Sequence, residues 1–213
     1  TNTTLLYDIL KRKGRAFASG NIGTALSRTV LEHGEEDADI SLELGAVHLT
    51  GMPTFHPLVS VIMNLTPDHL DFFPSLDAYY DTKKNVYKNQ TGDEWFLLNL
   101  DDEEVMKRCT DVPCRVVTFS LYQEADLMIE GDWITLFKER LFRKDDLQIV
   151  GMHNVQNAMV ACAMAMKMGV DKAVCRKVIA NFKGIEHRIE YVKTVKGVKY
   201  YNDSKGTNTD STV

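Results

Sequence analysis

Apolar positions alternate along the chain between helical spacing and short strand-like runs. The opening segment 5–10 places leucine and isoleucine at helical spacing, which predicts a helix. The run 58–65 is almost continuously apolar and rich in β-branched residues, as is typical of a central strand in a parallel sheet. Strict alternation predicts a further strand at 40–44. Two shorter apolar runs predict strands at 95–99 and 115–119. A helix is expected between them, at 103–109.

The later part of the chain changes pattern twice. Two strand-like segments flank Gly131-Asp132 and predict a small antiparallel meander that extends to about residue 150. Helices are expected at 154–168 and 171–182, followed after Gly184 by two strands at 189–195 and 198–202. We therefore predict an α/β fold with a mostly parallel, phosphate-loop-type sheet flanked by helices, together with the meander. The predicted domains are a central domain at 1–183 and the start of a second α/β domain at 184–213.

Composition and charge argue against nucleic acid and membrane as binding partners. The net charge of −5 over 213 residues gives no sign of a basic surface for nucleic acid. No apolar run approaches the roughly 20 residues of a membrane span, and no signal peptide opens the sequence, so we expect a cytoplasmic protein without a membrane partner. Four cysteines without a CxxC pair predict reduced thiols: Cys109, Cys114, Cys162 and Cys175.

Polar residues crowd directly after several predicted strands, where open α/β sheets bind their ligands. Glu43 ends one strand, Asp68-His69 follows another, and Lys83 lies on a predicted helix shortly afterwards. Taken singly, these residues could equally be a solvated carboxylate, a hydrogen-bonded structural histidine and a surface lysine. The loop 202–208 is too polar for a core and too rich in Asp, Lys and Thr for a neutral linker.

Read together, these segments resemble the motifs of the Mur ligases. The resemblance extends over most of the chain, is weakest between 109 and 150, and rests on several motifs in the family's order: SLELGAVHL at 41–49, TPDHLD at 66–71, YYDTKKNVY at 79–87, GMHNVQN at 151–157, GIEHRIE at 184–190 and NDSKGTN at 202–208. Within the family, the last segment, the His-Arg pair and GNIG at 20–23 are similar to those of the ligases that add D-glutamate.

The resemblance implies an ATP-dependent amide ligase that adds D-glutamate to UDP-N-acetylmuramoyl-L-alanine through an acyl phosphate, in peptidoglycan precursor synthesis. It implies two Mg²⁺ ions beside Glu43, His69 and Lys83, which are also the catalytic residues. Because an ammonium group cannot ligate a cation, Lys83 is expected to be carbamylated. We expect a monomer. The resemblance also implies residues that bind ATP (Thr1, Asn2, Thr3, Thr4, Asn154, Asn157, Arg188, Asp203 and Lys205) and residues that bind the UDP-muramyl substrate or D-glutamate (Asn21 and Thr207).

The sequence departs from the family at two places. The family's phosphate loop reads GTNGKTTT, whereas this chain begins Thr1-Asn2-Thr3-Thr4-Leu5, and Gly45-Ala46 stands where the family has two serines. We expect a break between Asn2 and Thr3 where loop residues are missing, with Thr3 opening a helix that points at the pocket of Glu43 and His69. Those two residues are predicted at the carboxyl ends of neighbouring strands.

Three functional alternatives stay open beside the ligase for D-glutamate. A continuous chain between Asn2 and Thr3 would favour a non-catalytic Mur-like subunit that binds nucleotide. The enzymatic alternatives are another Mur ligase or a folylpolyglutamate synthase. The resemblance also leads us to expect that the family's N-terminal domain and most of its C-terminal domain lie outside the chain, so that the chain alone would be inactive.

Overall fold

A mostly parallel six-stranded sheet organises the computed structural model, which describes residues 1–68 and 71–206. Strands β3 to β6 run parallel, with Val61 opposite Leu97 in the first pair, and β7 and β8 add the antiparallel meander at one edge. Gly131, whose φ of 62° favours glycine, lies in the turn from β6 to β7. The predicted α/β class is confirmed. The strands follow the order β3 (Val59–Ile62), β4 (Gly92–Asn99), β5 (Cys114–Phe119), β6 (Leu127–Glu130), β7 (Trp133–Leu136) and β8 (Glu139–Arg143).

Two further strands form a separate parallel pair. β1 (Ala16–Gly20) and β2 (Asp39–Glu43) pair with each other over their whole length. The predicted adjacency of the strand bearing Glu43 and the strand before His69 is wrong, because β2 and β3 belong to separate sheets in the described part of the chain. His69 itself lies outside the described residues.

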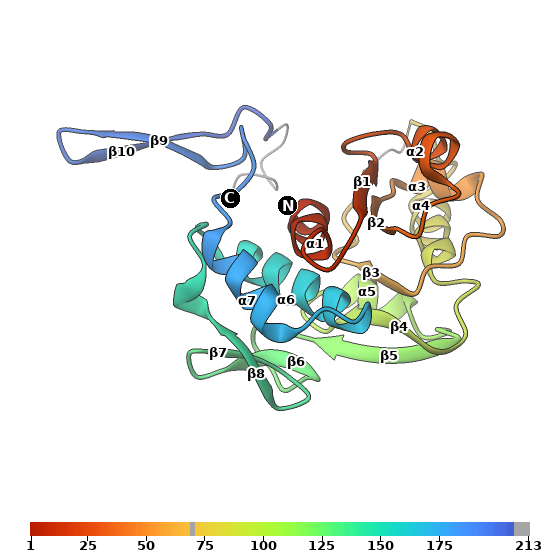
Figure 1. Cartoon of the computed structure of the whole chain (residues 1–213). Coiled ribbons are helices and arrows are strands. Elements are labelled where there is room, and N and C mark those ends of the chain that lie inside the picture. The colour runs from red at the N-terminus through yellow and green to blue at the C-terminus, as the bar shows by residue number, and fades with distance from the viewer. Residues whose placement is uncertain (69–70, 207–213) are drawn as a thin grey trace.

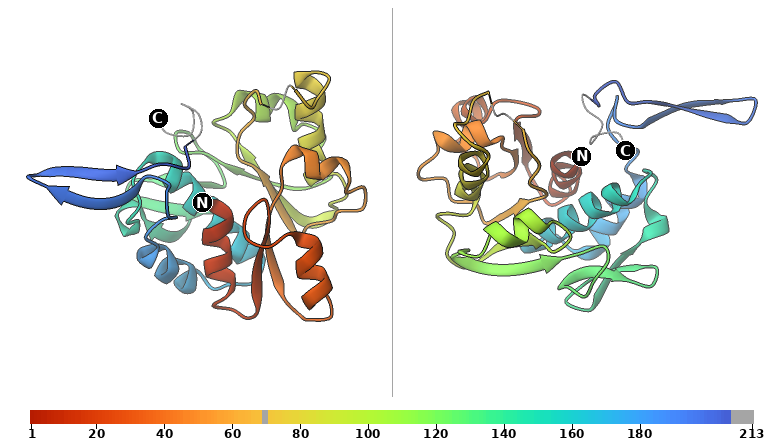
Figure 2. Two further views of the ribbon diagram at one scale, coloured as in Figure 1. Left: turned by 90° about the horizontal axis from the view of Figure 1, so that it is seen from above. Right: turned by 180° about the vertical axis from the view of Figure 1, so that it is seen from behind.

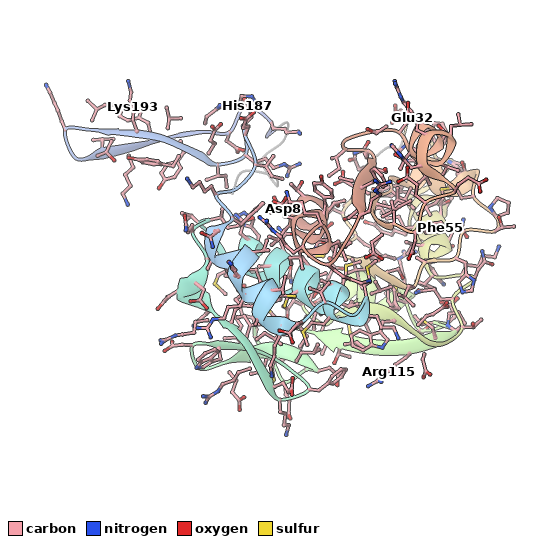
Figure 3. The ribbon with its side chains drawn as sticks, viewed as in Figure 1. Asp8, Glu32, Phe55, Arg115, His187 and Lys193 are labelled. Carbon is pink, nitrogen blue, oxygen red and sulfur yellow. The ribbon has the colours of Figure 1, made fainter. Side chains whose placement is uncertain are left out.

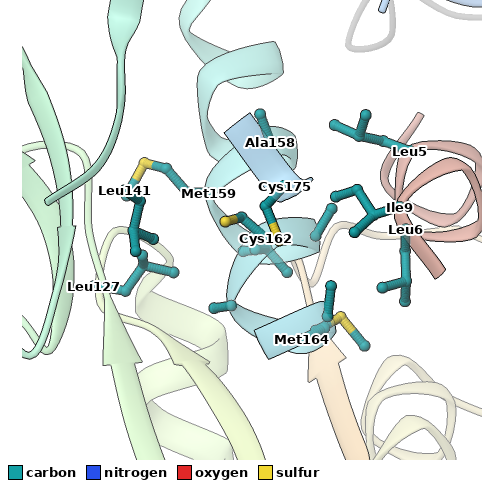
Figure 4. Close-up of a cluster of buried hydrophobic side chains, with 14 of the residues drawn as sticks. Leu5, Leu6, Ile9, Leu127, Leu141, Ala158, Met159, Cys162, Met164 and Cys175 are labelled. Carbon is teal, nitrogen blue, oxygen red and sulfur yellow. The ribbon is translucent and has the colours of Figure 1, made fainter. Parts of the chain in front are cut away.

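Helices cover both faces of the larger sheet (Figures 1 and 2). On one face α6 (Met152–Lys167), rich in Ala and Met, packs with α1 (Asn2–Leu10) and α7 (Lys172–Asn181) in the main core. Figure 4 shows Leu5, Leu6 and Ile9 of α1 directed at this cluster. On the other face, α4 (Leu76–Lys83) and α5 (Glu103–Arg108) contribute aromatic and aliphatic side chains to a second core.

Local sequence signals explain where several helices begin. Ser75 and Asp102 precede α4 and α5, and each side chain accepts a hydrogen bond from a backbone N–H three residues later. Asp171 caps α7 by accepting from the N–H of Ala173. The remaining short elements lie around the cavity described below or follow the meander: α2 (Leu26–His33), α3 (Ala46–Thr50), η1 (Lys84–Val86) and η2 (Lys144–Asp146).

The last described strands form a hairpin that projects from the rest of the molecule. β9 (Glu190–Val195) and β10 (Val198–Asn202) pair antiparallel, and Lys193 lies on this hairpin, away from Asp8 and Arg115 of the main body (Figure 3). The domain boundary at Gly184 stays a prediction. Cys109, Cys162 and Cys175 are buried and all four cysteines are free, as predicted. No helix among residues 1–68 and 71–206 combines the length and the apolar character that a membrane span needs.

Candidate functional site

A cavity of about 680 Å³ separates the edges of β2 and β3. The start of α1 lines it, as do segments of both strands, 40–44 and 58–64. Three candidate residues from distant parts of the sequence, Glu43, Lys83 and Arg188, line it together with Asn157 of α6. The structure thus brings most of the described candidates together at the carboxyl end of β2.

The first residues of the chain form the first turn of a helix and not a loop. Helix α1 runs without interruption through Asn2 and Thr3, and the N–H of Leu5 donates to the carbonyl of Thr1 at 3.0 Å. The expected break between Asn2 and Thr3 is wrong. The helix opens at Asn2, one residue earlier than predicted, and its N-terminus faces the cavity through Thr1, Asn2 and Thr3, as predicted for this pocket.

The Glu43 carboxylate accepts hydrogen bonds from both sides. The hydroxyl of Thr3 donates to its Oε2 at 3.3 Å, and the side-chain amide of Asn21 donates to its Oε1 at 3.1 Å. The N–H of Asn21 also donates to the Glu43 carbonyl at 2.8 Å. Ser41 anchors α1 to the same strand, because its buried hydroxyl donates to the Thr3 carbonyl at 2.8 Å. Strand β2, helix α1 and the loop after β1 therefore fix Glu43 jointly.

Two neighbouring lysines at the end of α4 have different surroundings. Lys83 lines the cavity, and its ammonium lies 4.7 Å from the centre of the Tyr79 ring. Lys84 instead donates to Asp111 at 2.8 Å, and this hydrogen bond holds the pKa of the Asp111 carboxyl below its usual range. Of the two lysines only Lys83 lines the cavity, and its functional role stays a prediction.

A second cavity of about 70 Å³ adjoins the first, because Thr1, Asn157 and Arg188 line both. Asn154 and Asp203 line this smaller cavity only. Five of the nine predicted ATP-binding residues therefore gather here, from the two ends of the described chain and from α6. Neither cavity is lined by Thr4 or Lys205, and Thr207 lies outside the described residues.

Positive charge reaches the start of α1 from the C-terminal part of the chain, because Arg188 lines both cavities together with Thr1. Asn154 has a structural task as well, since its side-chain amide donates to the Val150 carbonyl at 2.7 Å.

The protein offers few metal ligands at this site, which suits a Mg²⁺ ion whose coordination is completed by water and phosphate. Within residues 1–68 and 71–206, no three His, Cys, Asp or Glu side chains gather as a metal site. Mg²⁺ is commonly held by one or two carboxylates with waters and substrate phosphates. Glu43, with the hydroxyl group of Thr3 beside it, fits that pattern. Lys83 can contribute a metal ligand only after conversion to an oxygen-bearing group, so the second ion and the carbamylation stay predictions.

Sequence reasoning gave no role to three residues of this site, Gly20, Ser41 and Asn64, although Gly20 and Ser41 lie within quoted motifs. Asn64 lines the large cavity just after β3, and the rule that polar residues follow functional strands could have found it. Gly20 has a φ of 103°, and a Cβ there would lie 2.1 Å from the Glu43 carbonyl oxygen. No local signal revealed that contact, because it depends on the pairing of β1 with β2.

Comparisons with known proteins match this chain to one family of domains. The model of the Mur ligase middle domain matches residues 1–165. The chain is 37% identical over 214 residues to the UDP-N-acetylmuramoylalanine–D-glutamate ligase of Fusobacterium nucleatum subsp. nucleatum, covering 100% of this chain and 49% of that protein. It is 36% identical over 220 residues to the enzyme of the same name from Thermoanaerobacter sp., covering 100% of this chain and 48% of that protein. The chain thus spans about half the length of these relatives.

Solved structures share the fold at low sequence identity. MurF from Acinetobacter baumannii superposes with a TM-score of 0.74 at 20% identity, covering 95% of this chain and 48% of that one. MurF from Thermotoga maritima, solved in complex with ADP, superposes with a TM-score of 0.72 at 19% identity, covering 95% of this chain and 50% of that one. At this identity the likeness concerns the fold alone.

Proposed function

Since the chain belongs to the Mur ligase middle-domain family, we propose that it is the nucleotide-binding part of an ATP-dependent ligase that joins D-glutamate to UDP-N-acetylmuramoyl-L-alanine. The observation that carries the proposal is the meeting of Glu43, Lys83, Asn157 and Arg188, from four separate segments, in one cavity at the N-terminus of α1. Whole-chain similarity to ligases of this name supports the choice of D-glutamate.

The proposed reaction transfers the γ-phosphoryl group of ATP to the carboxylate of the muramyl substrate. ADP leaves, and the amine of D-glutamate then attacks the acyl carbon, so that phosphate leaves and an amide forms. Such transfers need positioning and neutralisation of charge more than a protein nucleophile. The free N–H groups at the start of α1 and the guanidinium of Arg188 supply positive potential beside the cavity.

Bound Mg²⁺ would neutralise charge on the phosphate oxygens, and Glu43 is the residue that would hold the first ion. Asn154, Asn157, Asp203 and Thr1 would contact the nucleotide from the smaller cavity. We propose His69 and carbamylated Lys83 for a second ion, and Thr207 for the amino-acid substrate. The magnesium requirement, the cytoplasmic location, the monomeric state and the roles in cell shape and cell division belong to the same proposal.

The test is a ligase assay on the protein in its full natural length. ATP-dependent phosphate release in the presence of UDP-N-acetylmuramoyl-L-alanine should require D-glutamate, while L-lysine and meso-diaminopimelate should not replace it. Turnover with either of the latter would assign the protein to another branch of the family and reject the D-glutamate proposal.

A further inference from the structure

Both oxygens of the Glu43 carboxylate are held by donors from different elements. Thr3 of α1 reaches Oε2 and Asn21, in the loop after β1, reaches Oε1. A carboxylate offers about four acceptor positions, so two remain free after these contacts. The two donors restrict rotation of the carboxylate and so fix the direction of the remaining positions.

The backbone around these donors is also fixed. Asn21 is tied to β2 by its own N–H, which donates to the Glu43 carbonyl, and Gly20 approaches that carbonyl so closely that a Cβ would lie 2.1 Å from it. Thr3 is tied to β2 by the buried hydroxyl of Ser41. Each donor is therefore anchored to the strand that carries the carboxylate it contacts.

We propose that Thr3 and Asn21 are positioning residues, which orient the Glu43 carboxylate so that its free acceptor positions meet a divalent cation. This inference rests on the proposed function, because Glu43 is the proposed ligand of the first ion. It gives both residues a task in holding the ligand, in place of direct contact with ATP for Thr3 and with substrate for Asn21. Removing a hydrogen bond to a metal ligand commonly lowers metal affinity by roughly 10- to 100-fold.

The test measures Mn²⁺ binding to the full-length protein in the presence of a non-hydrolysable ATP analogue, followed by the electron paramagnetic resonance signal of free Mn²⁺. Thr3→Val keeps the size of the side chain and removes the donor, and Asn21→Leu does the same in the loop. We expect each to weaken Mn²⁺ binding about tenfold or more. Thr3→Ser, which keeps the hydroxyl, should bind Mn²⁺ nearly as the wild type does. Thr24→Val, a change in the same loop whose side chain is exposed, is the matched control.

The outcomes separate the two levels of the proposal. A wild-type chain that binds no Mn²⁺, or Glu43→Gln that binds it like the wild type, would reject the metal site and with it the positioning role. Loss of binding in Glu43→Gln with unchanged binding in Thr3→Val and Asn21→Leu would overturn the positioning role alone. Thermal unfolding of each variant tests for a merely structural effect. Loss of Mn²⁺ binding at an unchanged melting temperature, together with retained binding in Thr3→Ser, supports positioning.

Discussion

Lys83 and Lys84 are adjacent in sequence, but their side chains have different surroundings. Lys83 faces the large cavity, whereas Lys84 is held by Asp111. We predict that Lys83→Ala lowers ligase turnover of the full-length protein by about 100-fold, and that raised bicarbonate fails to restore it because alanine cannot carry a carbamate. Lys84→Ala is the matched control and should retain turnover. Equal activity of the two variants in a phosphate-release assay would remove Lys83 from the mechanism.

Substitutions at Gly20 and Gly131 separate the stability cost of a steric clash from the cost of backbone strain. Both have positive φ, but a Cβ at Gly131 would meet nothing within 4 Å, while one at Gly20 would meet the Glu43 carbonyl oxygen. Gly131→Ala should cost about 1 kcal/mol of unfolding free energy from backbone strain alone. Gly20→Ala should cost more, about 3 kcal/mol, because overlap with the backbone adds to the strain. Denaturant unfolding of the two variants checks this order, and similar losses would contradict it.

At the scale of elements, α1 joins the site to the core. Its polar first turn faces the cavity while its apolar face packs on α6 and α7. Ile9 is fully buried in this packing. We predict that Ile9→Ala lowers the free energy of unfolding by about 2–5 kcal/mol, since it leaves a cavity between the helices.

Leu31 of α2 provides the matched control for Ile9→Ala. It is 87% exposed, so Leu31→Ala should change stability by less than about 0.5 kcal/mol. Urea denaturation monitored by circular dichroism measures both variants. A small loss for Ile9→Ala would show that α1 is held by its polar first turn and not by its apolar face.

Elements with a strong local pattern were predictable from the sequence. The apolar run before residue 66 predicted β3, and the Ala- and Met-rich segment predicted α6. Both predictions used only the spacing of apolar residues within the segment. The meander followed from the turn at Gly131. Within the site, Glu43 and Lys83 were identified because motif spacing identifies residues without knowledge of their contacts.

Long-range pairing was not predictable in this way. Nothing in the segments around Glu43 and His69 specifies which strands become neighbours, so their predicted adjacency failed. The role of Ser41 and the close approach of Gly20 to Glu43 have the same origin, because both depend on β1, β2 and α1 meeting in three dimensions. The expected break after Asn2 failed because four polar residues were assigned to a loop, although helix α1 includes three of them.

At the scale of the whole molecule, the described strands other than the β9–β10 hairpin divide into a pair and a six-stranded sheet that face each other across the large cavity. Helix packing through α1 connects the pair to the rest, because no ladder of hydrogen bonds joins β2 to β3 in the described residues. Hydrogen bonds of a sheet open cooperatively, and a two-stranded ribbon is only marginally stable by itself.

The facing edges of β2 and β3 therefore imply an uneven distribution of local stability. The amides of β1 and β2 should exchange with deuterium at least about tenfold faster than those of β4 and β5, which have strands on both sides. Native-state hydrogen exchange of the 213-residue chain, read by mass spectrometry of peptides 16–20, 39–43, 92–99 and 114–119, measures the difference. If the four segments exchanged at one rate, the chain would open as a single cooperative unit. If the pair exchanged first, Glu43 would lie on the part of the molecule that opens most readily, and the shape of the site would fluctuate with it.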